Sequence, residues 1–140
     1  VSVDGGPFAP SFAFNCSHLG NRLITLLVTD GGGNTATCTQ ISLVRDINAP
    51  TFMAPASVVV ECDDSTVPAS TGQPTNVVDA CDATPTVTFT DQITPGSCPQ
   101  EFTITRFWMA TDDSGNTRTI TQVITVQDNT APMFTMQSVV

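Results

Sequence analysis

The five cysteines are the residues of this chain with the most evident chemistry. None of them forms the Cys-x-x-Cys pair that zinc and redox sites use, so structural disulfide bonds are expected. Cys16 and Cys38 are the only cysteines before residue 48, and we predict that they pair. Cys62 and Cys81 flank a loop-rich stretch and form our second predicted pair, although either could instead bond to Cys98. In this pairing scheme Cys98 is left over, and it is either a buried free thiol or part of an intermolecular cross-link.

Acidic and amide side chains suggest a second kind of chemistry, the binding of calcium through oxygen ligands. The segments VRDINAPTF (44–52) and VQDNTAPMF (126–134) resemble the Asp-x-Asn-x-Pro-x-Phe junctions of cadherins, which bind calcium between domains. The candidate ligands are Asp46, Asn48, Asp112, Asp128 and Asn129. The alternative is that Asp and Asn occupy these positions because they favour turns, and that the prolines only end the preceding strands.

Catalysis and nucleic-acid binding have little support in the sequence. His18 is the single histidine, no nucleophile motif accompanies it, and one histidine cannot build the usual zinc sites. Asp63 and Asp64 are adjacent, so in an extended segment their side chains point apart. A net charge of -9 with only four basic residues argues against nucleic acid. No apolar run is long enough for a membrane span. We predict that the chain is not an enzyme.

An internal repeat with an offset of 82 residues organises the chain. The shift aligns GNTATCTQISLVRDINAPTF (33–52) with GNTRTITQVITVQDNTAPMF (115–134) without a gap, and it places Cys16 on Cys98. In each copy apolar residues alternate with period two on both sides of a Gly- and Asn-containing turn, which predicts a β-hairpin. Several short strands with frequent turn signals predict an all-β, antiparallel sandwich.

The repeat predicts parts of three units. Residues 48–130 form a complete unit, residues 1–47 hold the last strands of an earlier one, and residues 131–140 hold the first strand of another. Two explanations fit: the chain is cut from a longer array, or the last strand of one copy completes the incomplete first domain of the next. We predict that residues 131–140 add to a sheet formed by residues 1–47 of another copy, because an open strand edge is a template for association.

An apolar strip on the outer face of the hairpin predicts a second assembly contact. Alternation places Ile104, Trp108 and Ala110 in the core and leaves Phe107 and Met109 outside. The repeat sets Leu27 on Met109, and Leu23 shares that face. A repeated apolar strip is typical of an interface, the rival being coverage by a loop or strand of the same chain. With the tail, the predicted assembly residues are Leu23, Leu27, Phe107, Met109, Phe134, Met136 and Val139.

Several motifs together resemble the hyalin-repeat-like and immunoglobulin-like tandem repeats of large bacterial surface proteins. They are VVVECDD, VVDACDATPTVTF, TPGSCP, TITRFWMATDDSGNT and VQDNTAPMF, preceded by FNCSHLGNRLITLLVTDGGGNTATCT. The resemblance implies immunoglobulin-like sandwiches in a secreted or surface-attached protein of adhesion, gliding or extracellular filaments, without catalysis. Relatives often carry a cysteine where this chain has Ser114, which leaves the partner of Cys98 open.

The expected function is that of a structural subunit or repeat of an extracellular bacterial filament or surface fibre. Copies would join head to tail through strand addition and the apolar strip. One alternative is an adhesive module that binds a carbohydrate or a host protein, and another is an accessory domain of a larger secreted enzyme. An acidic chain with several cysteines fits an exported protein, because disulfides persist in oxidising compartments.

Overall fold

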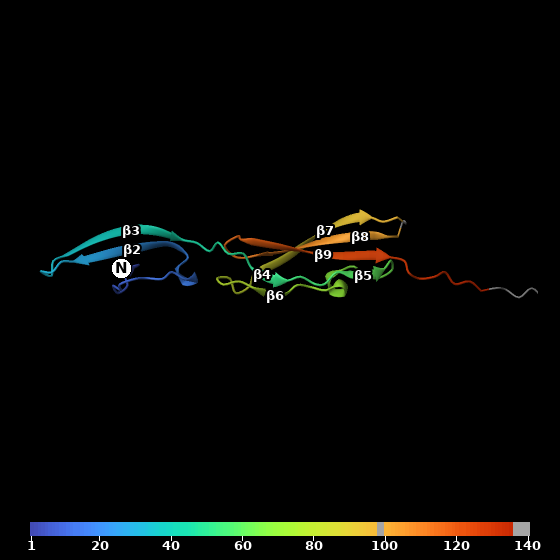
Figure 1. The fold of residues 1–140 in the computed structure, drawn as a ribbon, viewed down its shortest axis with the longest axis horizontal. Coiled ribbons are helices and arrows are strands. Elements are labelled where there is room, and N and C mark those ends of the chain that lie inside the picture. The colour runs from blue at the N-terminus through green and yellow to red at the C-terminus, as the bar shows by residue number, and fades with distance from the viewer. Residues whose placement is uncertain (98–99, 136–140) are drawn as a thin grey trace, which may run out of the picture. The chain divides into compact units, whose positions relative to one another are not determined.

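The computed structural model describes residues 1–97 and 100–135 of the chain (Figure 1). The fold is all-β: strands account for 48% of the residues, and they form three mostly antiparallel sheets beside one short helix. The chain divides into two compact units, Val1–Asn48 and Ala49–Val140. Each unit has its own strands and is described by itself.

The first unit contains a single sheet, with its strands in the order β1-β2-β3. Its strands are β1 (Ser2–Val3), β2 (Gly20–Thr29) and β3 (Thr35–Val44). β2 and β3 form the predicted hairpin, with antiparallel register from Gly20 opposite Val44 to Thr29 opposite Thr35. Both strands are rich in threonine and aliphatic residues, which favour this extended backbone.

The segment between β1 and β2 is held against one end of this sheet by Arg22. Its guanidinium forms an ion pair with Asp4 at 3.1 Å. It also donates hydrogen bonds of 2.8 to 3.1 Å to the carbonyl oxygens of Ser17, His18 and Leu19, in and beside a short 3-10 turn. The planar, multiply donating guanidinium is suited to gathering several acceptors in this way.

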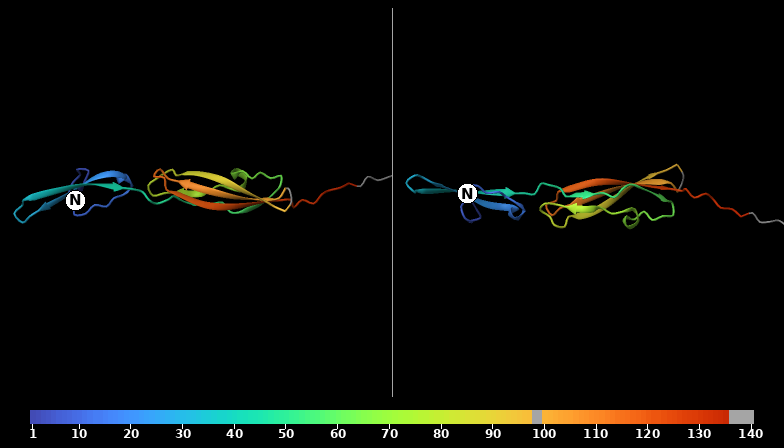
Figure 2. Two further views of the ribbon diagram at one scale, coloured as in Figure 1. Left: turned by 90° about the horizontal axis from the view of Figure 1, so that it is seen from above. Right: turned by 60° about the horizontal axis from the view of Figure 1, so that its bottom comes forward.

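The second unit is built from two sheets and the short helix α1 (Pro68–Thr71). The smaller sheet pairs β4 (Thr51–Met53) with β6 (Thr75–Val78). The larger sheet has the order β5-β9-β8-β7, with the strands Val58–Glu61, Thr117–Gln127, Phe102–Thr111 and Thr86–Pro95. Strand β5 runs parallel to β9, and the other pairs are antiparallel. The smaller sheet lies along one side of the layer formed by β7, β8 and β9 (Figures 1 and 2).

The core of the second unit lies where these layers meet. Phe52 from β4 packs with Trp108 and Ala110 from β8, so the two sheets share one apolar cluster. A second cluster contains Ile104, Ile124 and Val126 and lies nearer β5. The predicted inward residues of β8 are confirmed, since Ile104, Trp108 and Ala110 have 4%, 4% and 0% of their surfaces exposed.

The two hairpins reproduce the sequence repeat in three dimensions. Strand β2 (Gly20–Thr29) and strand β8 (Phe102–Thr111) differ by the 82-residue offset at both ends. The register is also conserved between them, because Gly20 lies opposite Val44 and Phe102 opposite Val126. Gly33 and Gly115 occupy the same turn position with a φ of +87°, a conformation that favours glycine. The same local sequence therefore builds the same hairpin in both units.

Candidate functional site

The two hairpins differ in what covers the face that forms the core of the second unit. The repeat places Leu26 on Trp108 and Val28 on Ala110. Trp108 and Ala110 are 4% and 0% exposed beneath Phe52, whereas Leu26 and Val28 are 47% and 58% exposed. The first unit thus presents at its surface the positions that the second unit buries.

Two residues of β3 extend this uncovered surface. Cys38 lies opposite Leu26 in the hairpin, and Cys38 and Gln40 are both exposed. Their repeat partners in the second unit are Ile120, which packs against the Phe52 cluster, and Gln122, which is buried. We call the surface formed by Leu26, Val28, Cys38 and Gln40 the open face.

The rest of the same sheet face is better covered. Arg22 and Ile24 are half-buried, beside the segment that Arg22 holds in place. The outer edge of β3 is a different case. In the second unit the corresponding strand β9 pairs in parallel with β5, but β3 pairs only with β2 among the strands described. The first unit thus combines an open face with an open strand edge.

The described part of the predicted donor tail is itself exposed. Residues 131–135 form no strand, and Met133 and Phe134 are 99% and 86% exposed. The repeat places Phe134 on Phe52, which is only 7% exposed in the core of the second unit. The other two predicted tail contacts, Met136 and Val139, lie outside the described residues.

The predicted outer strip lies on the opposite face of the hairpins. Met109 is 39% exposed and Phe107 is half-buried, and both line a hollow of about 140 Å³ beside β7. In the first unit Leu23 is 44% exposed and Leu27 is half-buried. The sequence prediction considered only the first strand of each hairpin. It missed Ile41 on β3, which lies directly opposite Leu23 and is 67% exposed. The alternation of β3 could have revealed Ile41.

The predicted disulfide pairs are both wrong. One disulfide joins Cys16 to Cys81, while Cys38 and Cys62 carry exposed free thiols. Cys16 precedes the start of β2, whereas Cys38 lies opposite Leu26, well along that strand. At about 3.3 Å per residue the two are roughly 20 Å apart, far beyond the Cα separation of about 7 Å that a disulfide spans.

Cys62 and Cys81 are separated by the length of the larger sheet. Cys62 follows Glu61, which lies beside Gln127 at the end of β9. Cys81 is next to Asp82, whose carboxylate accepts a hydrogen bond from the turn before β9 starts. Since β9 is 11 residues long, roughly 30 Å separates its two ends.

The odd cysteine Cys98 lies outside the described residues. The disulfide indicates an oxidising compartment.

One predicted calcium ligand, Asp112, lies close to a second aspartate of the same unit, Asp79. Asp79 and Asp112 each offer a carboxylate oxygen, and these two oxygens lie within 4.8 Å of one another. Sequence reasoning missed Asp79, in the motif VVDACDA, although it lies beside a cysteine and a second aspartate. Asp79 is oriented by the N–H groups of Cys81 and Asp82, which donate to it at 2.8 and 3.0 Å. Carboxylates are suitable oxygen ligands for calcium.

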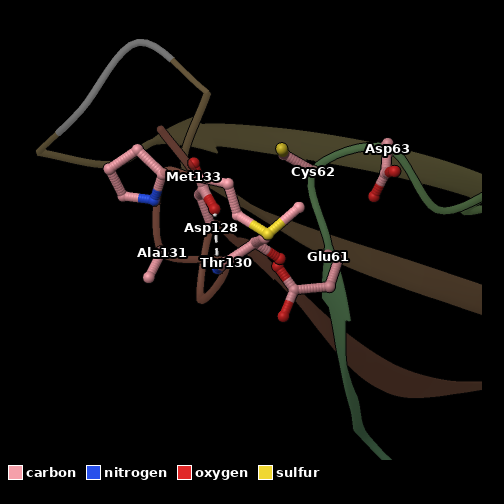
Figure 3. Close-up of a pocket in the computed structure, with 8 residues that line it drawn as sticks. Glu61, Cys62, Asp63, Asp128, Thr130, Ala131 and Met133 are labelled. Carbon is pink, nitrogen blue, oxygen red and sulfur yellow. Dashed lines mark hydrogen bonds between the residues drawn. The ribbon is translucent and has the colours of Figure 1, made fainter. Parts of the chain in front are cut away.

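Among the other predicted calcium ligands, Asp46 and Asp128 accept bonds in local turns, whereas Asn129 contacts a distant residue. The backbone N–H of Asn48 donates to Asp46 at 3.0 Å, and Asp128 accepts the equivalent bond from Thr130 at 2.9 Å. The N–H of Asn129 donates to Glu61 at 2.9 Å. Asp128 lines a pocket of about 660 Å³ whose other lining residues are Glu61, Cys62, Asp63, Thr130, Ala131, Pro132 and Met133 (Figure 3).

The hairpin turns hold a matched pair of aspartates, Asp30 and Asp112. Asn116 donates to both oxygens of Asp112, at 2.7 Å from its backbone and 2.8 Å from its side chain. Burial raises the pKa of Asp112, but these bonds outweigh it and bring the pKa below the ordinary 3.8. The Asn34 side chain, followed by its backbone N–H, likewise lowers the pKa of Asp30. The structural role of turn-forming aspartate accounts for these contacts.

We expect this arrangement to make the second unit sensitive to acid. A carboxylate whose folded pKa lies below its unfolded value stabilises the fold above the unfolded pKa, near 3.8, and loses that effect as pH falls through the folded pKa. We expect Asn116→Ala to lower the urea midpoint at pH 7, and the difference from the parent chain to shrink in acid. Trp108 is the single tryptophan and reports on this unit, so Asn34→Ala should leave its transition unchanged. A difference that persisted undiminished in acid would contradict the assignment.

No helix in the described part of the chain is both long enough and apolar enough to cross a membrane. A scan against protein-family models and a search of curated proteins both returned no match. What is established is therefore the class of fold, a chain of mostly β-strands arranged in several antiparallel sheets.

Proposed function

We propose that this chain is a structural repeat of an extracellular bacterial filament or surface fibre, in which copies join head to tail. The observation that carries the proposal is the contrast between two hairpins of identical register. The hairpin of the second unit is covered by β4 and β5. The hairpin of the first unit has an open face and an open edge at the matching positions. Apolar surface of this kind favours association, and a free strand edge accepts a strand from a partner.

The motifs and the fold class support the finer assignment to immunoglobulin-like tandem repeats of the hyalin-repeat-like kind. Two facing sheets around a small apolar core fit such a sandwich. The disulfide between Cys16 and Cys81 fits a secreted or surface-attached protein. The outer strip, enlarged by Ile41, supplies a second apolar contact between copies. We assign no catalytic role to any of these surfaces.

The test is self-association measured by light scattering and by negative-stain microscopy over a range of protein concentrations. We expect oligomers that grow with concentration, and we expect Leu26→Asp to weaken association at least tenfold because a charge would be buried against apolar groups. Ile47→Asp is the matched control, since Ile47 is 79% exposed and lies on neither proposed surface. A parent chain that stayed monomeric throughout, or equal effects of the two variants, would refute the proposal.

One observation favours the alternative of an adhesive module. The rings of Phe12, Phe14 and His18 meet edge to face at centroid distances of 5.0 to 5.9 Å. Phe12 and Phe14 are 39% and 40% exposed, and exposed aromatic rings are common in binding surfaces. His18 is positioned by the N–H of Asn15, which donates to its Nδ1 at 3.2 Å. A monomeric chain that bound glycans, and lost binding on Phe12→Ala, would favour this alternative over the filament.

A further inference from the structure

We propose that Phe134 of one copy inserts against Leu26 and Val28 of a second copy, in the way that Phe52 covers Trp108 and Ala110 within the second unit. This inference rests on the proposed function and specifies the contact that would carry it. It commits the open face to one occupant, the segment Ala131–Thr135 of another copy of this chain.

The second unit supplies the template for this contact. Phe52 packs with Trp108 and Ala110 in one cluster, and Ile120 lies beside them. Moving the donor by the repeat offset of 82 residues gives Phe134, while moving the acceptors back by the same offset gives Leu26, Val28 and Cys38. Donor and acceptor are therefore both present in this chain, in different units. Both are exposed, by 86% for Phe134 and by 47% and 58% for Leu26 and Val28.

The template also fixes how the tail lies. Strand β4, which carries Phe52, belongs to the smaller sheet, so it crosses the face of the larger sheet and does not extend its edge. Phe52 is buried between the exposed Thr51 and Met53. The tail should likewise direct Phe134 inward and its neighbours Met133 and Thr135 outward, in the alternation of an extended strand.

The surface available suits so short a donor. The Arg22 end of the face is half-buried, so a single three-residue strand like β4 would cover the part that is open. Residues 131–135 and the four residues of the open face carry no formal charge, so their contact would bury no ion.

The free thiol of Cys38 offers a direct test, because its counterpart Ile120 packs against the Phe52 cluster. In a chain with Cys62→Ser and Cys98→Ser, Phe134→Cys should form an intermolecular disulfide with Cys38 on mild oxidation. Met133→Cys is the matched control, since that neighbour should point outward; we expect cross-linking at least tenfold slower. Non-reducing gels would show the dimers, peptide mapping would locate the 38–134 bond, and Cys38→Ser should abolish it.

Because Phe134→Cys itself removes the ring that is proposed to bind, a second measurement is needed. In the otherwise native chain, Phe134→Ala should weaken self-association at least tenfold, and Met133→Ala should leave it nearly unchanged. Association that survived Phe134→Ala, a 38–134 bond within one molecule, or equal cross-linking from position 133 would overturn this contact while leaving filament formation intact. A parent chain that failed to associate at all would overturn both.

Discussion

Replacing Arg106 with alanine should lower the free energy of unfolding of the second unit by about 3 to 5 kcal/mol. Only 2% of the Arg106 surface is exposed. Its Nε and one terminal nitrogen each donate to Asp91 at 2.8 Å, which makes a two-point ion pair. The remaining donors reach the hydroxyl of Thr71 at 3.0 Å and the carbonyl of Thr66 at 2.9 Å. Alanine would remove these bonds together and leave a cavity.

The aromatic surroundings add to the expected loss. The guanidinium carbon of Arg106 lies 4.6 Å from the Phe89 ring centroid and 5.7 Å from that of Trp108, within the range of cation–π attraction. Arg106→Lys should be intermediate, because an ammonium cannot reproduce the planar two-point contact. Arg118→Ala is the control, as Arg118 is exposed on β9 and should change stability by less than about 0.5 kcal/mol. Urea unfolding followed by Trp108 fluorescence measures all three; similar midpoints for Arg106→Ala and Arg118→Ala would contradict the network's importance.

The hairpins and the inward positions of β8 followed from the sequence because both depend on local order. Period-two alternation needs only a strand, and the turn needs only its Asp, Gly and Asn. Arg106 falls on the same inward side as Trp108, but no sequence pattern shows that Asp91 and Thr71 will accept its hydrogen bonds. Asp91 lies opposite Arg106 only because of the register of β7 on β8, and Thr71 comes from a segment 35 residues away, so neither contact can be read from local order.

The predicted disulfide pairs were wrong for a related reason. Pairing by closeness in sequence, Cys16 with Cys38 and Cys62 with Cys81, ignored how far a strand travels per residue. Long strands carry sequence neighbours to opposite ends of a sheet, and the observed bond joins Cys16 to Cys81 instead. Asp79 was missed in the same way, since it approaches Asp112 from a segment distant in the sequence. Composition indicated an oxidising environment, while the connectivity required the fold.

The 82-residue repeat places Gln40 at the position of Gln122, so Gln40 is an internal control for the effect of replacing Gln122. The side-chain nitrogen of Gln122 donates to the carbonyls of Thr71 at 2.7 Å and Ala56 at 2.9 Å, and its oxygen accepts from the Trp108 ring nitrogen at 3.2 Å. Gln122→Ala would leave the Thr71 carbonyl and the Trp108 ring N–H buried without partners, and it would remove the bond to the carbonyl of the exposed Ala56. Because each unsatisfied buried group costs about 1 to 3 kcal/mol, we expect a loss of about 3 to 4 kcal/mol.

The same substitution at the repeat position should be nearly silent. Gln40 occupies the matching place on β3, but it is exposed on the open face, so Gln40→Ala should change stability by less than about 0.5 kcal/mol. Both variants are measured by chemical unfolding of the dilute chain, followed by Trp108 fluorescence for Gln122→Ala and by circular dichroism for Gln40→Ala. A comparable loss at both positions would mean that the first unit buries this face as the second does, and the open face would then be wrong. A large loss at Gln122 alone would show that one strand position changes from dispensable to essential when a second sheet covers it.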